Sequence, residues 1–205
     1  MGKEKIILIG GGGHCKVIID AIRKAGEYEI EGIVDPELRV DDEVSGVPVF
    51  GDDSILPELF NSGIKNAFIG VGSTGDCQAR KRLYQTIKGV GFNSPVIIHP
   101  KAVIAEDVEI HDGVFIAAGA IINPGVRVGE NSIINTRSSV DHDCRIGKDV
   151  HIAPGATLSG GVEVGDETHI GTGSNITQYV KIGKGCFIRS GALVSKNMAD
   201  GEKHG

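Results

Sequence analysis

Residues 134–152 are INTRSSVDHDCRIGKDVHI, and within them an aliphatic residue recurs at every sixth position. The spacing continues in both directions without an insertion, over sixteen hexapeptides: Ile104, Ile110, Ile116, Ile122, Val128, Ile134, Val140, Ile146, Ile152, Leu158, Val164, Ile170, Ile176, Ile182, Ile188 and Val194. An amphipathic helix repeats at 3.6 residues and an open strand at 2.0, so neither produces a period of six. Hexapeptide repeats are typical of a parallel β-helix, here expected to be left-handed.

The remaining positions of each hexapeptide complete a triangular prism. Three short strands joined by corners close one coil, and the six-fold aliphatic residue points into a narrow core. Small residues that share this core follow four positions later, for example Ala120, Ser138 and Ala156. Asn or Gly often follows the aliphatic residue directly, as at Asn135 and Gly147, and we expect these residues to supply corners with positive φ. The 31 glycines and the 4% aromatic content suit such a narrow core.

The first half of the chain has a different pattern, in which short apolar runs alternate with helical segments. Strands are expected at residues 5–9, 31–34, 47–50, 67–71 and 96–98. Helices are expected at residues 15–25, 53–60 and 76–88. This alternation predicts a parallel sheet with right-handed crossovers. We therefore divide the chain into a Rossmann-like α/β domain at 1–98 and a β-helix domain at 99–205.

The charge balance of the chain argues against a nucleic-acid partner. There are 21 Lys and Arg against 27 Asp and Glu, a formal net charge of −6, whereas phosphate backbones are bound by clustered basic surfaces. The densest basic run is Arg80-Lys81-Arg82. It lies on an expected helix, and we interpret it as a solvated face.

Membrane, secretory and metal signals are lacking in the sequence. No stretch approaches the roughly 20 apolar residues that span a bilayer, and the N-terminus has no apolar region and cleavage site of a secretory signal. The cysteines match no zinc pattern. They are Cys15, Cys77, Cys144 and Cys186. We expect a cytoplasmic location, reduced thiols, no membrane partner and no metal.

An outward-facing His–Asp pair is the strongest candidate for chemistry. His142 follows the core residue Val140 by two positions, so it projects from the prism beside Asp143. A neutral imidazole, with an ordinary pKa of about 6.5, is a suitable base at neutral pH, and a neighbouring carboxylate can orient it. An ordinary surface histidine is the alternative. Cys144 occupies an inward position, so we expect it to be buried and inert rather than an acylated nucleophile.

Three loops of the α/β half are expected to converge. The glycine run Gly10–Gly13 follows the first strand and precedes a helix, a geometry that turns backbone amides toward an anion. Asp35-Pro36 ends the second strand and Gly72 the third, and the carboxyl ends of parallel strands meet at one edge. The run is not a complete dinucleotide fingerprint, and a lone glycine run is a weak signal.

A glycine-rich βα unit with Gly13-His14 ahead of an unbroken prism resembles the sialic acid O-acetyltransferase and UDP-4-amino-sugar N-acetyltransferase family. That family includes the enzyme that acetylates the bacillosamine precursor. The sharpest segment is residues 140–156, VDHDCRIGKDVHIAPGA. Many members end in a segment containing Val-Pro-Ala-Lys near the cofactor's adenine, which residues 193–205 lack. The adenosine contacts would then fall to the coils or to residues beyond Gly205.

The resemblance implies a role for each candidate residue. His142 would be the general base and Asp143, often Glu in the family, its supporting acid. His151 would contact the thioester region of acetyl-CoA, and Thr172 and Ser190 its pantetheine arm, largely through the backbone. The acceptor would be held by Gly12, Gly13, His14, Asp35, Pro36 and Gly72. Asn135 either positions the acceptor or is a corner residue chosen for its φ.

The spacing of two histidines favours an oligomer of this chain. His142 and His151 are nine residues apart, half a coil, and so lie on opposed parts of the perimeter. If both serve one site, the site lies between subunits, and the resemblance implies a homotrimer. His169 is one coil above His151, so a plain ladder of stacked histidines is an alternative.

Taken with the resemblance, these features predict an acetyl-CoA-dependent N-acetyltransferase that acts on a nucleotide-linked 4-amino sugar, with UDP as the expected nucleotide. A GDP- or dTDP-linked amino sugar and O-acetylation of a sialic acid are the near alternatives. An NAD-binding regulatory module and a non-catalytic β-helix spacer belong to other classes. The incomplete fingerprint and the lack of a Tyr/Lys pair argue against the first, and the His142–Asp143 pair against the second.

Overall fold

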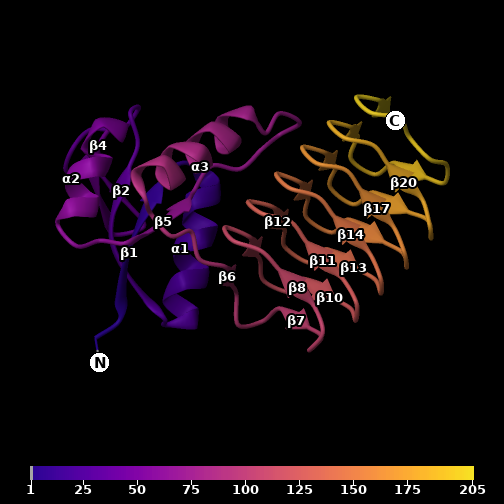
Figure 1. Ribbon diagram of the computed structural model, residues 1–205, viewed down its shortest axis with the longest axis horizontal. Helices are drawn as coiled ribbons and strands as arrows, with labels where there is room; N and C mark the ends of the chain where they lie inside the picture. The colour runs from indigo at the N-terminus through magenta and orange to yellow at the C-terminus, as the bar shows by residue number, and fades with distance from the viewer. Residues whose placement is uncertain (1) are drawn as a thin grey trace.

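Two units of different construction lie end to end in the computed structural model, which describes residues 2–205 (Figure 1). The N-terminal unit contains a five-stranded sheet in the order β3-β4-β2-β1-β5. Its strands are β1 (Glu4–Ile9), β2 (Tyr28–Val34), β3 (Glu43–Val44), β4 (Val47–Gly51) and β5 (Asn66–Ile69). All pairs are parallel except β3 with β4, which confirms the expected parallel sheet and adds a short antiparallel edge.

Helices cover both faces of this sheet. They are α1 (Gly13–Ala25), the 3-10 helix η1 (Asp53–Ile55), α2 (Leu56–Asn61) and α3 (Gln78–Val90). Alternate residues of β1 supply the two cores, because Ile6 and Leu8 pack on the α1 side whereas Ile7 and Ile9 pack on the α2 and α3 side. A strand buried on both faces has a continuous apolar sequence, which is why β1 lacks alternation.

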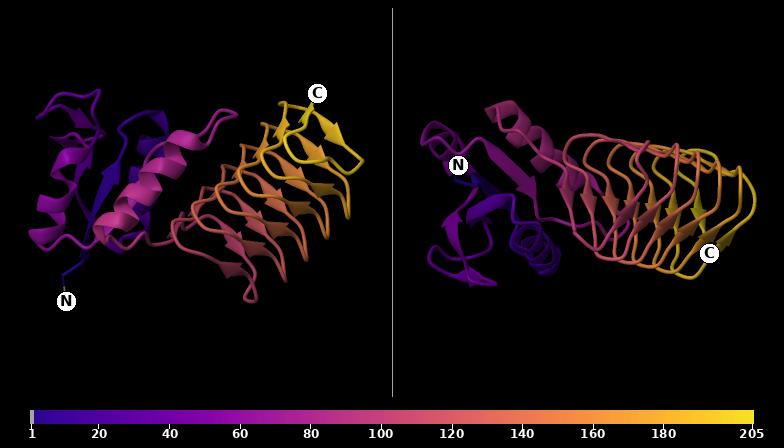
Figure 2. Two further views of the ribbon diagram at one scale, coloured as in Figure 1. Left: turned by 45° about the horizontal axis from the view of Figure 1, so that its top comes forward. Right: turned by 90° about the horizontal axis from the view of Figure 1, so that it is seen from below.

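The C-terminal unit is a left-handed β-helix built from three parallel sheets (Figure 2). The first, here called the covered sheet, comprises β6 (Ile97–Ile98), β9 (Phe115–Ile116), β12 (Ile133–Ile134), β15 (His151–Ile152), β18 (His169–Ile170), β21 (Phe187–Ile188) and β23 (Lys203–His204). The open sheet comprises β7 (Val103–Ile104), β10 (Ile121–Ile122), β13 (Ser139–Val140), β16 (Thr157–Leu158), β19 (Asn175–Ile176) and β22 (Leu193–Val194). The charged sheet comprises β8 (Glu109–Ile110), β11 (Arg127–Val128), β14 (Arg145–Ile146), β17 (Glu163–Val164) and β20 (Lys181–Ile182).

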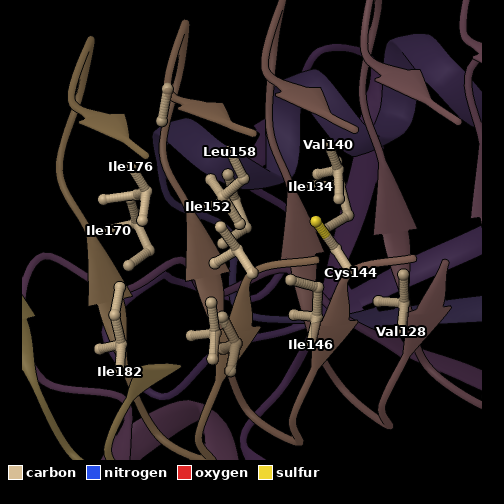
Figure 3. Close-up of a cluster of buried hydrophobic side chains, with 14 of the residues drawn as sticks. Val128, Ile134, Val140, Cys144, Ile146, Ile152, Leu158, Ile170, Ile176 and Ile182 are labelled. Carbon is tan, nitrogen blue, oxygen red and sulfur yellow. The ribbon is translucent and has the colours of Figure 1, made fainter. Parts of the chain in front are cut away.

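The six-fold aliphatic residues fill the prism, as the spacing predicts. Each two-residue strand from β7 to β22 ends on one of them, and the column Val128, Ile146 and Ile182 lies on one side of the core (Figure 3). The small residues four positions later are buried as well, for example Ser138 and Ala156. Cys144 is fully buried at such a position, and burial raises the pKa of its thiol to about 11.

Glycine and asparagine do supply corners with positive φ, for example Gly119 (φ 70°) and Asn131 (φ 54°), which confirms the expected residue types. The position differs from the expected one: positive φ occurs at the third residue after the aliphatic residue, Arg137 (φ 56°) included, and not at Asn135 or Gly147 directly after it. Gly147 serves a different purpose, since a Cβ there would lie 2.7 Å from the backbone nitrogen of Asp166 in the next coil. Close stacking of coils therefore selects glycine there.

The two units share side chains at their junction. Phe115 and Ile133 of the covered sheet join the core beneath α1. The segment expected as the last strand of the α/β half forms β6, but it pairs with β9 of the prism and not with the N-terminal sheet. The junction is thus a packed interface between the two units.

Helix α3 is fastened to the corner between the charged and covered sheets, here called the Asp149 edge. Arg80 is 1% exposed, and its guanidinium donates to the carbonyl oxygens of Asn131 and, at 2.7 Å, of Asp149. Burial lowers the pKa of Arg80 to about 10. Lys81 pairs with Glu167 at 2.8 Å. The interpretation of this basic run as a solvated face is therefore wrong, because two of its three residues dock the helix.

No helix within residues 2–205 combines the length and the apolar character needed to cross a bilayer.

Candidate active site

A cavity of about 740 Å³ opens at the carboxyl edge of the N-terminal sheet. Its walls come from the segments after β1, β2 and β5 and from α3. The six residues expected to hold the acceptor all line it: Gly12, Gly13, His14, Asp35, Pro36 and Gly72. The structure therefore brings together the three loops that the sequence predicts to converge.

The glycine loop, residues 10–13, borders open space in the cavity at Gly12 and Gly13. A Cβ built at Gly12 or Gly13 would meet no atom within 4 Å, whereas one at Gly10 or Gly11 would strike a neighbouring side chain. Gly12 is the N-cap of α1 without a side-chain cap, and the first turn carries no acidic residue. The uncapped amides and the positive end of the helix dipole therefore face open space, an arrangement suited to an anion.

His14 and Asp35 shape the cavity wall. The His14 ring lies edge-on to Phe115 with 5.5 Å between centroids, and burial lowers its pKa to about 4, so the ring is neutral at physiological pH. Asp35 accepts hydrogen bonds from the backbone nitrogens of Gly11 (2.7 Å) and Glu37 (2.8 Å). Asp35 thus ties the glycine loop to the end of β2.

Helix α3 forms a wall of this cavity that the sequence alone does not reveal. Ala79, Arg82, Leu83 and Thr86 of α3 line it. Their spacing of three, four and seven residues places them on one helical face. That periodicity is visible in the sequence, but it does not reveal which surface the face meets, because the docking contacts of α3 come from residues 131–167.

His142 lies at the corner between the open and charged sheets, here called the His142 edge. Its Nδ1 is 2.8 Å from Oδ2 of Asp143, and both side chains are more than half exposed. The hydrogen bond with Asp143 raises the pKa of His142 above its ordinary value. Asp143 occupies the corner position of its hexapeptide with a left-handed φ of 60°.

The other ring nitrogen of His142 faces the next coil. A Cβ at Gly160 would lie 2.5 Å from Nε2, so the imidazole rests where only glycine leaves room. The backbone nitrogen of His142 donates to Oδ1 of Asp141 at 2.8 Å, and Asn123 donates to the same oxygen at 2.9 Å. The corner is fixed, and Nε2 is the nitrogen left for proton transfer.

His151 is 7% exposed and bridges the two units. Its Nδ1 lies 2.8 Å from the backbone oxygen of Ser73, and its Nε2 lies 2.9 Å from Nδ2 of Asn135. This pattern fits a neutral ring with hydrogen on Nδ1, and burial lowers its pKa to about 3. Both ring nitrogens are engaged, and the backbone N–H of His151 donates to the carbonyl oxygen of Thr168 at 3.0 Å. The expected acetyl-CoA contact of His151 stays a prediction.

The ladder of stacked rings considered as an alternative is present. His151 packs edge-on to His169 with 5.0 Å between centroids, and His169 stacks on Phe187 at 5.3 Å. Asn135 does not have the φ of a left-handed corner; its side chain instead bonds His151 and accepts from the nitrogen of Thr136 at 2.7 Å. The reading of Asn135 as a residue selected for positive φ is therefore wrong.

Thr172 and Ser190 occupy the third corner, between the covered and open sheets, here called the Thr172 edge. The His142 edge and the Thr172 edge are the two borders of the open sheet. One chain therefore does not bring His142 together with Thr172, Ser190 or His151. Among residues 2–205, no group of three His, Cys, Asp or Glu side chains is arranged to hold a metal ion.

Comparison with known proteins matches both units. The PglD N-terminal domain model matches residues 5–87, and the bacterial transferase hexapeptide model matches residues 94–124 and 125–160. Perosamine N-acetyltransferase from Caulobacter crescentus, solved as a mutant with CoA and GDP-perosamine, is 37% identical with a TM-score of 0.92, covering 100% of this chain and 94% of that one.

Two further solved structures are similar over nearly the whole chain. The acetyltransferase domain of PglB from Neisseria gonorrhoeae, in complex with acetyl coenzyme A, is 33% identical with a TM-score of 0.87, covering 100% of this chain and 97% of that one. WeeI from Acinetobacter baumannii is 24% identical with a TM-score of 0.79, covering 98% and 96%, and supports the fold alone.

Proposed function

The chain belongs to the hexapeptide-repeat acetyltransferase family whose members carry a PglD-type N-terminal domain, and from this premise we propose that it N-acetylates a nucleotide-linked 4-amino sugar. It is an acetyl-CoA-dependent acetyltransferase. In the proposal, residues 1–98 bind the acceptor, and residues 99–205 bind acetyl-CoA and carry out the transfer.

The observation that carries the acceptor assignment is the open cavity over the glycine loop. Its volume of about 740 Å³ lies within the range of small-molecule sites. Free space over Gly12 and Gly13 and the uncapped start of α1 suit a diphosphate. A free sialic acid has no diphosphate to occupy the space over Gly12 and Gly13, so O-acetylation of that sugar is the weaker candidate.

UDP and GDP are the two nucleotides favoured for the acceptor, and dTDP is the third alternative. The resemblance of the sequence favours a UDP-linked sugar. The Caulobacter relative was solved with GDP-perosamine, which makes a GDP-linked sugar the specific alternative.

The proposed chemistry is direct transfer with His142 as the general base. The neutral amine attacks the thioester carbonyl carbon, the new C–N bond forms and the C–S bond breaks. Nε2 of His142 takes the amine proton and returns it to the departing thiolate of CoA, while Asp143 stabilises the imidazolium. A backbone N–H would stabilise the oxyanion, and positioning of the two substrates supplies the rest.

The arrangement of the three sheets supports an intersubunit site in a homotrimer. The N-terminal unit packs on the covered sheet, and the charged sheet presents Glu109, Arg127, Arg145, Glu163 and Lys181. The open sheet instead presents exposed apolar residues, among them Val103 (63% exposed) and Leu193 (61%). If a second copy packs beside the open sheet, the His142 edge of one chain meets the Thr172 edge of its neighbour. Acetyl-CoA would then lie in the groove between them.

A panel of acceptors tests the proposal. Thiol release from acetyl-CoA is measured with UDP- and dTDP-linked 4-amino sugars, GDP-perosamine and free sialic acid. Turnover confined to nucleotide-linked amino sugars supports the assignment, and the preferred member identifies the nucleotide. Turnover of sialic acid without competition from UMP or GMP would overturn it.

A further inference from the structure

We propose that Arg82 is the cation that binds the diphosphate of the acceptor, an inference that rests on the proposed function. No residue of α3 is among those that the family resemblance assigns to acceptor binding. The structure nevertheless makes this helix one wall of the cavity that the glycine loop also lines.

The helical spacing determines which way Arg82 faces. Ala79, Arg82, Leu83 and Thr86 line the cavity and fall on one face of α3, whereas the intervening Arg80 and Lys81 reach the prism. Ala79 and Leu83 are apolar, and Thr86 donates its hydroxyl hydrogen to the carbonyl oxygen of Arg82 at 3.0 Å. Arg82 is therefore the charged residue on this face.

The charges around the cavity give Arg82 a distinct role. Among the cavity-lining residues of the described chain, Asp35, Glu37 and Asp53 carry carboxylates and Arg82 is the one cation, because the pKa of His14, lowered to about 4, leaves that ring neutral. A doubly negative diphosphate would be repelled by these carboxylates. A cation in the same cavity as the uncapped amides of α1 offsets that repulsion.

Arg82 is uncommitted within the chain, in contrast to its neighbours. Arg80 bonds Asn131 and Asp149, and Lys81 pairs with Glu167. Arg82 forms no ion pair with any carboxylate within residues 2–205. A guanidinium presents parallel N–H donors that match phosphate oxygens in a bidentate manner, which a lysine cannot reproduce.

Contacts between α3 and the prism determine the position of Arg82. Because Arg80 and Lys81 fasten the start of α3 to the Asp149 edge, the next residue is held in register with the same edge. The acceptor pocket of residues 1–98 is thus completed by a side chain whose position depends on residues 99–205.

Calorimetric titration of the full chain with nucleotides and nucleosides tests the inference. The probes are GDP and UDP against guanosine and uridine, on wild type, Arg82→Ala, Arg82→Lys and Lys88→Ala. Lys88→Ala is the matched control, since it removes a positive charge from the same helix and the ion pair it breaks is an exposed one with Asp112. We expect Arg82→Ala to weaken diphosphate binding roughly 10- to 100-fold and to leave nucleoside binding unchanged. Arg82→Lys should recover part of the loss, and Lys88→Ala should match wild type.

Kinetics supply the second readout. Arg82→Ala should raise KM for the nucleotide-linked acceptor by a similar factor with KM for acetyl-CoA unchanged. Equal weakening of nucleosides and diphosphates, or no weakening of either, would overturn the role of Arg82 while leaving the acceptor class intact. If wild type itself binds neither diphosphate, the proposed function fails, and the inference fails with it.

Discussion

The imidazole of His142 and the carboxylate of Asp143 are joined by a 2.8 Å hydrogen bond at an exposed corner of the prism. Both residues lie in the turn between β13 and β14, where Asp143 has a left-handed φ of 60°. One oriented nitrogen, Nε2, is left free. The acetyl transfer proposed here depends on this pair.

The pH dependence of activity should reflect the hydrogen bond between His142 and Asp143. The bond to Asp143 raises the pKa of His142, and a general base must be neutral to act. Activity therefore falls as the pH drops through this pKa, and the acid limb of kcat/KM lies above the ordinary value of about 6.5. Asp143→Asn tolerates the positive φ and should move the limb to lower pH. An unchanged limb would show that another group sets it.

Loss of the base should abolish most turnover without unfolding the chain. His142→Ala removes an exposed side chain that contributes nothing to the core. We expect kcat to fall by about 10² to 10⁴-fold, with the melting temperature unchanged, and Asp143→Asn to lose less because the base remains. Near-wild-type turnover of His142→Ala in the thiol-release assay would eliminate this residue as the base.

A side chain at Gly12 should act only on the acceptor. A Cβ there meets no atom of the protein, so Gly12→Val fills ligand space and strains nothing else. KM for the nucleotide-linked sugar should rise sharply, with KM for acetyl-CoA nearly constant. Gly89→Val, also in open space but at the far end of α3, is the control. A parallel rise in both KM values would point to general damage.

Asp35→Ala is a less selective probe than its place in the cavity suggests. Because its carboxylate holds the nitrogens of Gly11 and Glu37, its removal releases the loop as well as any ligand contact. We therefore expect a loss beyond the roughly 0.5–1.5 kcal/mol of one hydrogen bond. Binding of a nucleoside diphosphate measures it, and an effect within that range would show that the loop keeps its shape without Asp35.

Assembly should depend on the open sheet. Wild type is expected to sediment at three chain masses. Ile121→Glu places a charge on the exposed apolar face (Ile121 is 41% exposed) and should dissociate the trimer and remove activity. Lys181→Glu, on the charged sheet, should preserve both. A wild-type monomer with full activity would contradict an intersubunit site.

The sequence predicted the prism almost residue by residue, because its period is local and each core position repeats the same steric demand. The convergence of Gly12, Asp35 and Gly72 also followed from strand order alone. The contacts that dock the two units could not be predicted from the sequence. Arg80 meets Asp149 across 69 residues and His151 meets Ser73 across 78, and no local periodicity encodes either contact.

The product of the reaction gives the most direct test of the central claim. Wild type is incubated with acetyl-CoA and the preferred nucleotide-linked 4-amino sugar, and the product is analysed by mass spectrometry before and after hydroxylamine, which cleaves esters but not amides. The account predicts one added acetyl group that survives hydroxylamine and does not form with His142→Ala. An acetyl group lost to hydroxylamine, or acetylation of free sialic acid in its place, would contradict it.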